Sequence, residues 1–194
     1  MTDPKTLKKE LRLQALARRD ALDPAYRIET AMRMADEAEA IGVDPGQVVS
    51  GFLPIRSELD IRPLMMAQAS RGARLCVPAM IDRQTIVFRA LVRGAPLVDN
   101  GFGTLAPPED AEVLLPDIML MPLAAFDGAG NRIGYGAGYY DRAIAALQAQ
   151  GRRPRLIGMA FDCQQVEAVP AEPHDVPLHA LWTDSGYRVL DRED

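Results

Sequence analysis

A run of alternating glycines separates a predicted strand from a predicted helix: Arg132-Ile133-Gly134-Tyr135-Gly136-Ala137-Gly138-Tyr139-Tyr140-Asp141-Arg142. Glycines at alternate positions let the backbone take positive φ angles, and without Cβ atoms the backbone N–H groups can approach a ligand closely. The helix that begins near Tyr139 adds the positive end of its dipole. This segment is therefore typical of a cradle for an anion such as phosphate.

The glycine spacing differs from two well-known phosphate motifs. It lacks the third glycine of the dinucleotide-binding fingerprint at its usual distance, and it lacks the Gly-Lys-Ser/Thr of a P-loop. A tight turn that packs closely is therefore an alternative interpretation of the glycines alone. The flanking residues favour phosphate, because Arg132 can pair with it and Asp141 can hold a magnesium ion that bridges phosphate oxygens. The structural alternative for Asp141-Arg142 is a first-turn acid with a local ion pair.

The rest of the chain alternates short apolar runs with helical segments. Apolar runs bounded by proline or glycine predict strands over residues 47–53, 74–78, 85–91, 113–121, 155–161 and 180–183. Helical periodicity predicts helices over residues 4–22, 24–41, 61–70 and 139–150. The alternation predicts one three-layer α/β domain over residues 1–194, in which helices flank a mainly parallel or mixed central sheet and the chain opens with a helical pair.

Two segments allow more detailed predictions. Segment 96–116 is rich in proline, glycine and acidic residues and has no periodicity, so we expect a long surface connection. On the second helix, the 3.6-residue period predicts a buried stripe that consists of Ile28, Ala31, Met32, Ala35 and Ala38.

The composition limits the class of protein. With 48% hydrophobic and 25% charged residues in 194, the chain resembles an ordinary soluble domain. The net charge of −5 disfavours broad binding to nucleic acid or to an anionic membrane. No apolar run reaches the roughly 18 residues of a membrane span, and the chain starts with a charged helix rather than a signal peptide. We therefore expect a cytoplasmic protein without nucleic-acid or membrane partners. We also expect a monomer, although nothing in the composition determines the oligomeric state.

The glycine-rich segment also resembles a family signature. Together with Met121-Pro122-Leu123 and Phe126-Asp127, it is similar to the signature of the 5-formyltetrahydrofolate cyclo-ligases, also called methenyltetrahydrofolate synthetases. The resemblance spans nearly the whole chain, because further blocks agree in order and spacing: Lys8-Lys9-Glu10-Leu11-Arg12, Glu58-Leu59-Asp60, Ile157-Gly158, Phe161-Asp162, Pro170 and His174-Asp175.

The resemblance implies an activity and a set of site residues. It implies that ATP, as co-substrate, and Mg²⁺ drive the cyclisation of 5-formyltetrahydrofolate to 5,10-methenyltetrahydrofolate, with release of ADP and phosphate and without a protein nucleophile. It implies ATP contacts from Lys8, Arg12, Arg132, Ile133, Gly134, Tyr135, Gly136, Ala137, Gly138, Tyr139 and Tyr140. It implies folate contacts from Leu53, Glu58, Tyr135, Gly136, Ala137, Gly138 and Tyr139, and Mg²⁺ ligands from Asp141 and Asp175.

Three positions qualify this assignment. Ala137 stands where many family members carry lysine, so one cationic phosphate contact is absent. Ile61 stands where the family usually has threonine after the acidic block. His174, beside Asp175, is interpreted as a structural residue rather than a catalytic one.

Two other functions compete with this interpretation. A sugar-phosphate isomerase-like enzyme would use the loop for phosphate without ATP, but it would need a lysine or paired carboxylates near the sheet edge, and no lysine follows Lys9. A non-catalytic nucleotide- or folate-binding paralogue should lack Glu58, Asp141 or Asp175, and all three are present.

Overall fold

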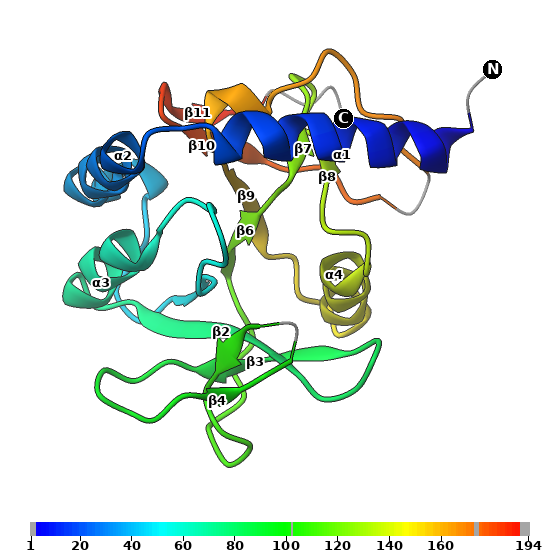
Figure 1. The fold of residues 1–194 in the computed structure, drawn as a ribbon. Helices are drawn as coiled ribbons and strands as arrows, with labels where there is room; N and C mark the ends of the chain where they lie inside the picture. The colour runs from blue at the N-terminus through cyan, green and yellow to red at the C-terminus, as the bar shows by residue number, and fades with distance from the viewer. Residues whose placement is uncertain (1–2, 102, 173–174, 191–194) are drawn as a thin grey trace.

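The computed structural model describes residues 3–101, 103–172 and 175–190, and a seven-stranded sheet in the order β11-β10-β9-β6-β1-β2-β3 lies at its centre (Figure 1). The inner strands run parallel to one another: β1 (Val48–Ser50), β2 (Arg74–Met80), β6 (Ile118–Pro122), β9 (Arg155–Met159) and β10 (Ala180–Thr183). The edge strands β3 (Ile86–Ala90) and β11 (Gly186–Val189) are antiparallel to their neighbours. The predicted mixed sheet is therefore confirmed.

The helices form two layers around the sheet. They are α1 (Pro4–Asp20), α2 (Pro24–Asp36), α3 (Arg62–Ser70) and α4 (Tyr139–Ala149), with short 3₁₀ helices η1 (Ala38–Ile41) and η2 (Asp162–Gln164). Asp3 and Asp23 accept backbone N–H groups of the first turns of α1 and α2, and a proline follows each cap. Helices α2 and α3 pack on one face of the sheet and α4 packs on the other, as a three-layer domain requires.

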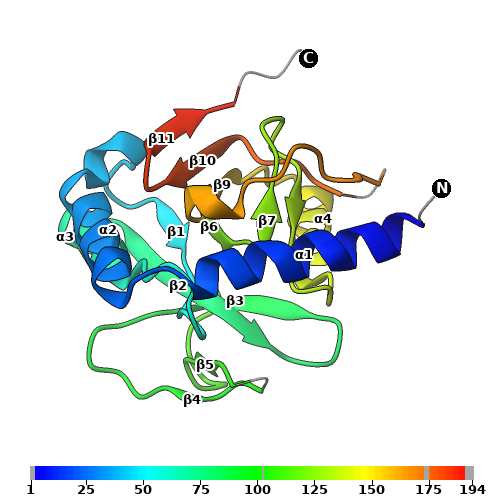
Figure 2. The same cartoon turned by 45° about the horizontal axis from the view of Figure 1, so that its top comes forward.

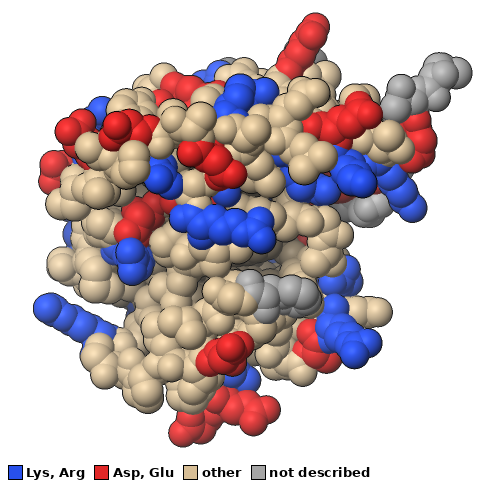
Figure 3. All heavy atoms as spheres, in the orientation of Figure 1, with Lys and Arg blue, Asp and Glu red and all other residues tan. Residues whose placement is uncertain are grey.

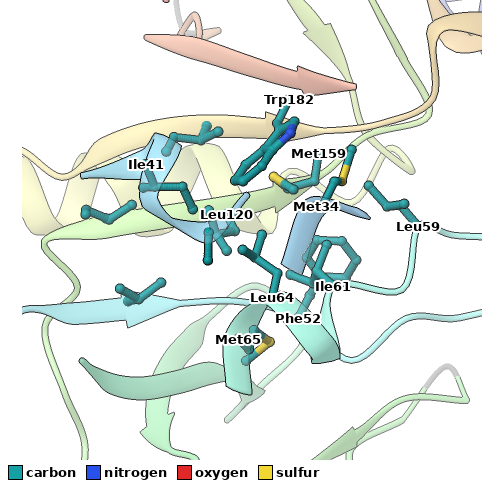
Figure 4. Close-up of a cluster of buried hydrophobic side chains, with 14 of the residues drawn as sticks. Met34, Ile41, Phe52, Leu59, Ile61, Leu64, Met65, Leu120, Met159 and Trp182 are labelled. Atoms are coloured by element: carbon teal, nitrogen blue, oxygen red, sulfur yellow. The ribbon is translucent and has the colours of Figure 1, made fainter. Parts of the chain in front are cut away.

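Strand β6 shows how both faces of the sheet are buried. Ile118 and Leu120 belong to the cluster under α2 and α3, whereas Met119 and Met121 belong to the cluster under α4. Figure 4 shows the first cluster, in which the fully buried Trp182 lies among side chains from α2, α3 and the sheet. Because both faces are covered, the strand is a continuous apolar run, which is why the sequence predicted it.

A small hairpin outside the main sheet positions the N-terminal helix. Strands β7 (Ala125–Phe126) and β8 (Arg132–Ile133) pair antiparallel just before the glycine-rich segment. Helix α1 lies across this hairpin (Figure 2), where Ala15 packs against Ala125 and Ile133. Helix α2 packs on α3 instead. The two predicted N-terminal helices therefore exist, but each packs on a different neighbour.

Several local predictions were wrong. On α2, Ile28 and Met32 are 64% and 51% exposed, and the buried residues include Met34, because a neighbouring face of the helix packs on α3. The strand predicted over 113–121 begins only at Ile118, while Val113 bridges to β3. Segment 96–116 contains a hairpin of β4 (Val98–Asp99) and β5 (Leu105–Ala106), whose strands are too short for a periodic signal.

None of the helices within the described ranges combines the length and apolar character that crossing a membrane requires.

Candidate functional site

A cleft of about 630 Å³ opens where β6 ends. Its walls come from α1, β8, the glycine-rich segment, the start of α4 and the segment around Asp175. Ligands of open α/β proteins bind at such carboxyl ends of parallel strands. Every residue predicted to contact ATP or Mg²⁺ lines this cleft: Lys8, Arg12, Arg132, Ile133, Gly134, Tyr135, Gly136, Ala137, Gly138, Tyr139, Tyr140, Asp141 and Asp175.

The glycine loop, residues 134–138, has the backbone geometry that the sequence predicted at two of its three glycines. Gly136 and Gly138 have φ angles of 100° and 68°, a region that favours glycine. Gly138 also precedes α4 directly, so the loop leads into the N-terminus of that helix. Gly134 does not have a positive φ angle, and a Cβ atom there would meet nothing within 4 Å. The strict conformational requirement therefore falls on Gly136 and Gly138.

The cleft is locally positive in an acidic protein. Six cationic side chains line it, against three acidic ones: Lys5, Lys8, Lys9, Arg12, Arg132 and Arg142, with Asp141, Glu172 and Asp175. Basic side chains gather along the N-terminal half of α1 in Figure 3. The chain as a whole has a net charge of −5, so this concentration of cations would attract an anionic ligand specifically to the cleft.

Ion pairs hold two of the cationic side chains of the cleft, those of Lys8 and Arg132, in place. The Lys8 ammonium lies 2.7 Å from Asp175 and 2.8 Å from Glu172. Partial burial disfavours its charge, but hydrogen bonds to the two carboxylates outweigh burial and raise the pKa of Lys8. Arg132, whose side chain is 7% exposed, donates from Nη2 to Asp141 Oδ1 over 2.7 Å. Asp141 is thus a first-turn acid of α4 in an ion pair, and its partner is Arg132.

Two further arginines brace the glycine loop through backbone carbonyl oxygens. Arg12 Nε donates to the carbonyl oxygen of Gly134 over 2.7 Å, which joins α1 to the loop. Arg142 donates to the carbonyl oxygens of Ala137 and Gln84 and stacks over the ring of Tyr139. The loop is therefore held from both sides before any ligand binds.

The predicted folate residues lie behind and beside the loop. Glu58, 9% exposed, accepts the Ile55 N–H over 2.8 Å and interacts electrostatically with the Tyr135 phenol. Burial raises the pKa of Glu58, and the Ile55 N–H, the Tyr135 hydroxyl and the charge of Arg19 oppose the rise. Leu53 is partly buried against the core. Glu58 and Leu53 do not line the cleft itself, but Tyr135 connects Glu58 to it.

Sequence reasoning missed Arg19, the only arginine of the described residues among the fully buried side chains. It is 1% exposed and donates to Ser57 Oγ and to the Tyr135 hydroxyl, each over 3.0 Å. Its spacing could have revealed it, because Arg19 stands seven residues after Arg12 and so lies near the same face of the helix.

The phenol of Tyr140 is directed into the protein interior. Its oxygen is buried and has no hydrogen-bond partner among the described residues. Burial raises the pKa of Tyr140, and the charge of Glu58 adds to the rise. The hydroxyl therefore stays protonated and is a donor without an acceptor, a condition that bound ligand or water commonly relieves.

A model of the 5-formyltetrahydrofolate cyclo-ligase family matches residues 4–184. The chain belongs to this family. A 5-formyltetrahydrofolate cyclo-ligase of Escherichia coli (strain K12) is 33% identical over 175 residues, which cover 87% of this chain and 95% of that protein. One of Mycolicibacterium smegmatis is 30% identical over 194 residues, which cover 94% of this chain and 97% of the relative.

Solved structures agree with the fold of the 5-formyltetrahydrofolate cyclo-ligase family. The NMR structure of Aquifex aeolicus 5,10-methenyltetrahydrofolate synthetase superposes with a TM-score of 0.77 at 26% identity, covering 97% of this chain and 95% of that one. A 5,10-methenyltetrahydrofolate synthetase from Mycoplasma pneumoniae superposes with a TM-score of 0.71 at 23% identity, covering 90% and 96%, and supports the fold alone. His174, in the family's C-terminal block, lies outside the described residues, so its structural role stays a prediction.

Proposed function

We propose that the protein is a 5-formyltetrahydrofolate cyclo-ligase, which converts 5-formyltetrahydrofolate and ATP to 5,10-methenyltetrahydrofolate, ADP and phosphate in the presence of Mg²⁺. The observation that carries the proposal is the convergence of a glycine loop, a helix N-terminus and six cations on one cleft at the carboxyl edge of the sheet. Relatives that match this chain along nearly their whole length carry the same name.

The cleft suits the triphosphate of ATP. The backbone N–H groups of the glycine loop and of the first turn of α4 provide donors without side chains in the way. Lys8 and Arg12, four residues apart on one face of α1, would neutralise phosphate charge from the opposite wall. Arg132 is already ordered by its ion pair and would add a further cationic contact.

The acidic side chains of the cleft fit Mg²⁺ that arrives with the nucleotide. Asp141 and Asp175 bring two carboxylates to one cleft, and the described residues hold no group of three or more His, Cys, Asp or Glu arranged for a metal. Magnesium in nucleotide sites is typically held by one or two carboxylates together with phosphate oxygens. Bound there, it would neutralise charge on the phosphates.

The folate would lie against Glu58 and Tyr135. A reduced pterin ring presents N–H donors, and the Glu58 carboxylate is an acceptor held in place by the Ile55 N–H and by Tyr135. The tyrosine lines the cleft as well, so it would bring the formyl group close to the nucleotide. Positioning of two substrates in this way converts a bimolecular encounter into an intramolecular one.

The reaction needs no protein nucleophile. A formamide carbonyl is a poor electrophile because the nitrogen lone pair is delocalised into it, as in a peptide bond. In the proposed route the formyl oxygen attacks the γ-phosphorus and the bond to ADP breaks. The anilino nitrogen of the folate then attacks the formyl carbon and loses its proton, and phosphate leaves with the former formyl oxygen. Positioning and charge neutralisation are then the protein's contributions.

The proposal is tested with the purified full chain, 5-formyltetrahydrofolate and MgATP, by following the ultraviolet absorbance of the methenyl product. We expect an absorbance rise that requires ATP, stops when Mg²⁺ is chelated, and is matched one to one by released phosphate. 5-Methyltetrahydrofolate, which lacks the formyl oxygen, serves as the matched substrate control and should release no phosphate. Absence of an ATP-dependent product, or a product formed equally well without ATP, would overturn the proposal.

A further inference from the structure

The C-terminal half of α1 contains a buried cation whose role the nucleotide does not explain. Arg19 donates from Nε to Ser57 Oγ and from Nη1 to the Tyr135 hydroxyl, each over 3.0 Å. Within the described residues its guanidinium forms no ion pair with a carboxylate. A buried charge that is satisfied mainly by hydroxyl groups is costly, so a purely structural role would be poorly served by arginine.

The hydrogen bonds of Arg19 constrain the two hydroxyl groups beside it, those of Ser57 and Tyr135. A guanidinium only donates, so the oxygens of Ser57 and Tyr135 both act as acceptors toward it. Each hydroxyl then has a single proton left to donate. Ser57 donates its proton to Asp20, and the Tyr135 phenol interacts electrostatically with the Glu58 carboxylate. Arg19 therefore occupies an acceptor site of the Tyr135 oxygen, which leaves the phenol proton free to turn toward Glu58, and it holds the turn that contains Ser57.

That turn has an unusual backbone. The N–H of Glu58 bonds to the carbonyl oxygen of Ile55 over 3.0 Å, and between them Arg56 has a φ angle of 54°. It is the one non-glycine residue of the described chain with a positive φ angle. Such a conformation persists when surrounding contacts enforce it. The Arg19–Ser57 hydrogen bond is one of those contacts, because Ser57 lies inside the turn.

We propose that Arg19 is a positioning residue for the folate side of the reaction, which sets the Tyr135 phenol and the Ser57–Glu58 turn in the orientation that receives the substrate. The inference rests on the proposed function. Helix α1 would then serve both substrates, with Lys8 and Arg12 at the nucleotide and Arg19 about 10 Å further along the helix axis. The effect of losing Arg19 should therefore fall on the folate and spare ATP.

The test compares Arg19→Lys and Arg19→Gln with Arg18→Gln as the matched control. Arg18 is the adjacent residue of the same helix, and its guanidinium donates to the backbone carbonyl oxygens of Cys163 and Gln165 at the exposed surface. For Arg19→Gln we expect the KM for 5-formyltetrahydrofolate to rise about tenfold or more, while the KM for ATP stays within about twofold. Arg19→Lys keeps the charge and should recover part of the loss, and Arg18→Gln should match the wild type.

A second variant keeps the inference testable if Arg19→Gln does not fold. Tyr135→Phe removes the acceptor of Arg19 Nη1 while it keeps both Arg19 and Glu58 in place, and it should also raise the KM for the folate. In the Arg19→Lys/Tyr135→Phe double variant, the loss of folate binding free energy should be smaller than the sum of the losses in the two single variants. Both substitutions disrupt the same hydrogen-bond network. Equal rises in both KM values, or additive effects, would overturn the role of Arg19. If the wild-type protein formed no methenyl product, the proposed function itself would be refuted. Failure of the proposed function can therefore be told apart from failure of the role of Arg19.

Discussion

Arg132 Nη2 and Asp141 Oδ1 lie 2.7 Å apart, and this ion pair joins the two ends of the glycine loop. Arg132 belongs to the hairpin strand before the loop, and Asp141 lies in the first turn of the helix after it. The arginine side chain is 7% exposed, so its charge depends on this carboxylate. Asp141 therefore has two tasks, which are to neutralise Arg132 and, in the proposed function, to bind Mg²⁺.

Replacing Asp141 by asparagine should impair both tasks. We expect Asp141→Asn to lower turnover by about 100-fold or more at saturating Mg²⁺, because charge on the metal and on Arg132 is no longer balanced. We also expect a loss of about 2 kcal/mol in the free energy of unfolding, since a largely buried arginine loses its partner. Steady-state kinetics and urea unfolding measure the two effects.

The matched control for this change is Glu39→Gln, which breaks an ion pair with Arg71 of similar length on the exposed surface. Exposed ion pairs contribute little to stability, so the free energy of unfolding should change by no more than about 0.5 kcal/mol. Turnover should not change, because neither residue lines the cleft. Near-normal turnover of Asp141→Asn would contradict its assignment as a metal ligand.

Glu58→Gln should make the protein more stable and less active. Burial raises the pKa of Glu58 above its ordinary value of 4.5, so the folded state binds the proton more tightly than the unfolded state does. Stability from this group is present at low pH and is lost as pH rises through the folded pKa. We therefore expect the variant to have a higher Tm than the wild type near pH 7, and the difference to shrink toward about pH 4.

The activity of Glu58→Gln should move in the opposite direction. Loss of the carboxylate should lower kcat/KM for 5-formyltetrahydrofolate by about 100-fold, as expected when a charged acceptor is replaced by a neutral one. Thermal unfolding at both pH values and kinetics near pH 7 together test the assignment. A lower Tm near neutral pH would show that the carboxylate is stabilised rather than penalised by its surroundings.

Ala137→Lys should strengthen ATP binding. Ala137 lines the cleft and does not have a positive φ angle, so a longer side chain can be placed there without backbone strain. An added cation should lower the KM for ATP by about threefold or more at low salt, with a smaller effect at high salt. Ala137→Met adds length without charge and should leave the KM unchanged. An equal effect of both substitutions would assign the gain to packing.

Gly158→Ala should destabilise the sheet without touching the cleft. A Cβ atom on Gly158 would lie 2.6 Å from Leu178 Cδ1 and 2.9 Å from Leu181 Cδ2, so the core must shift. We expect a loss of about 1–3 kcal/mol in the free energy of unfolding, with normal activity per folded molecule. Gly128→Ala is the control, because its nearest atom is 4.0 Å away. Equal stability of the two variants would contradict the packing at Gly158.

Local signals in the sequence determined the central strands, the helices and the glycine loop. The inner strands are apolar on both faces and bounded by turn residues, so β6 and β9 could be predicted without knowledge of their partners. The two-residue strands of the β4–β5 and β7–β8 hairpins could not be predicted, because they exist only through pairing. Periodicity likewise showed that α2 has an apolar face but not which face would meet α3.

The residues of the candidate site also fall into two groups, those that the sequence predicted and those that only the tertiary structure revealed. The sequence alone determined which residues surround the glycine loop, because these positions are contiguous or belong to blocks of recognisable order. It also placed two adjacent arginines, Arg18 and Arg19, on α1. Only the tertiary structure decided that Arg18 is exposed and Arg19 is buried beside Tyr135. Successive residues point about 100° apart around a helix, so the docking of α1 on the β7–β8 hairpin selects which of the two faces the site.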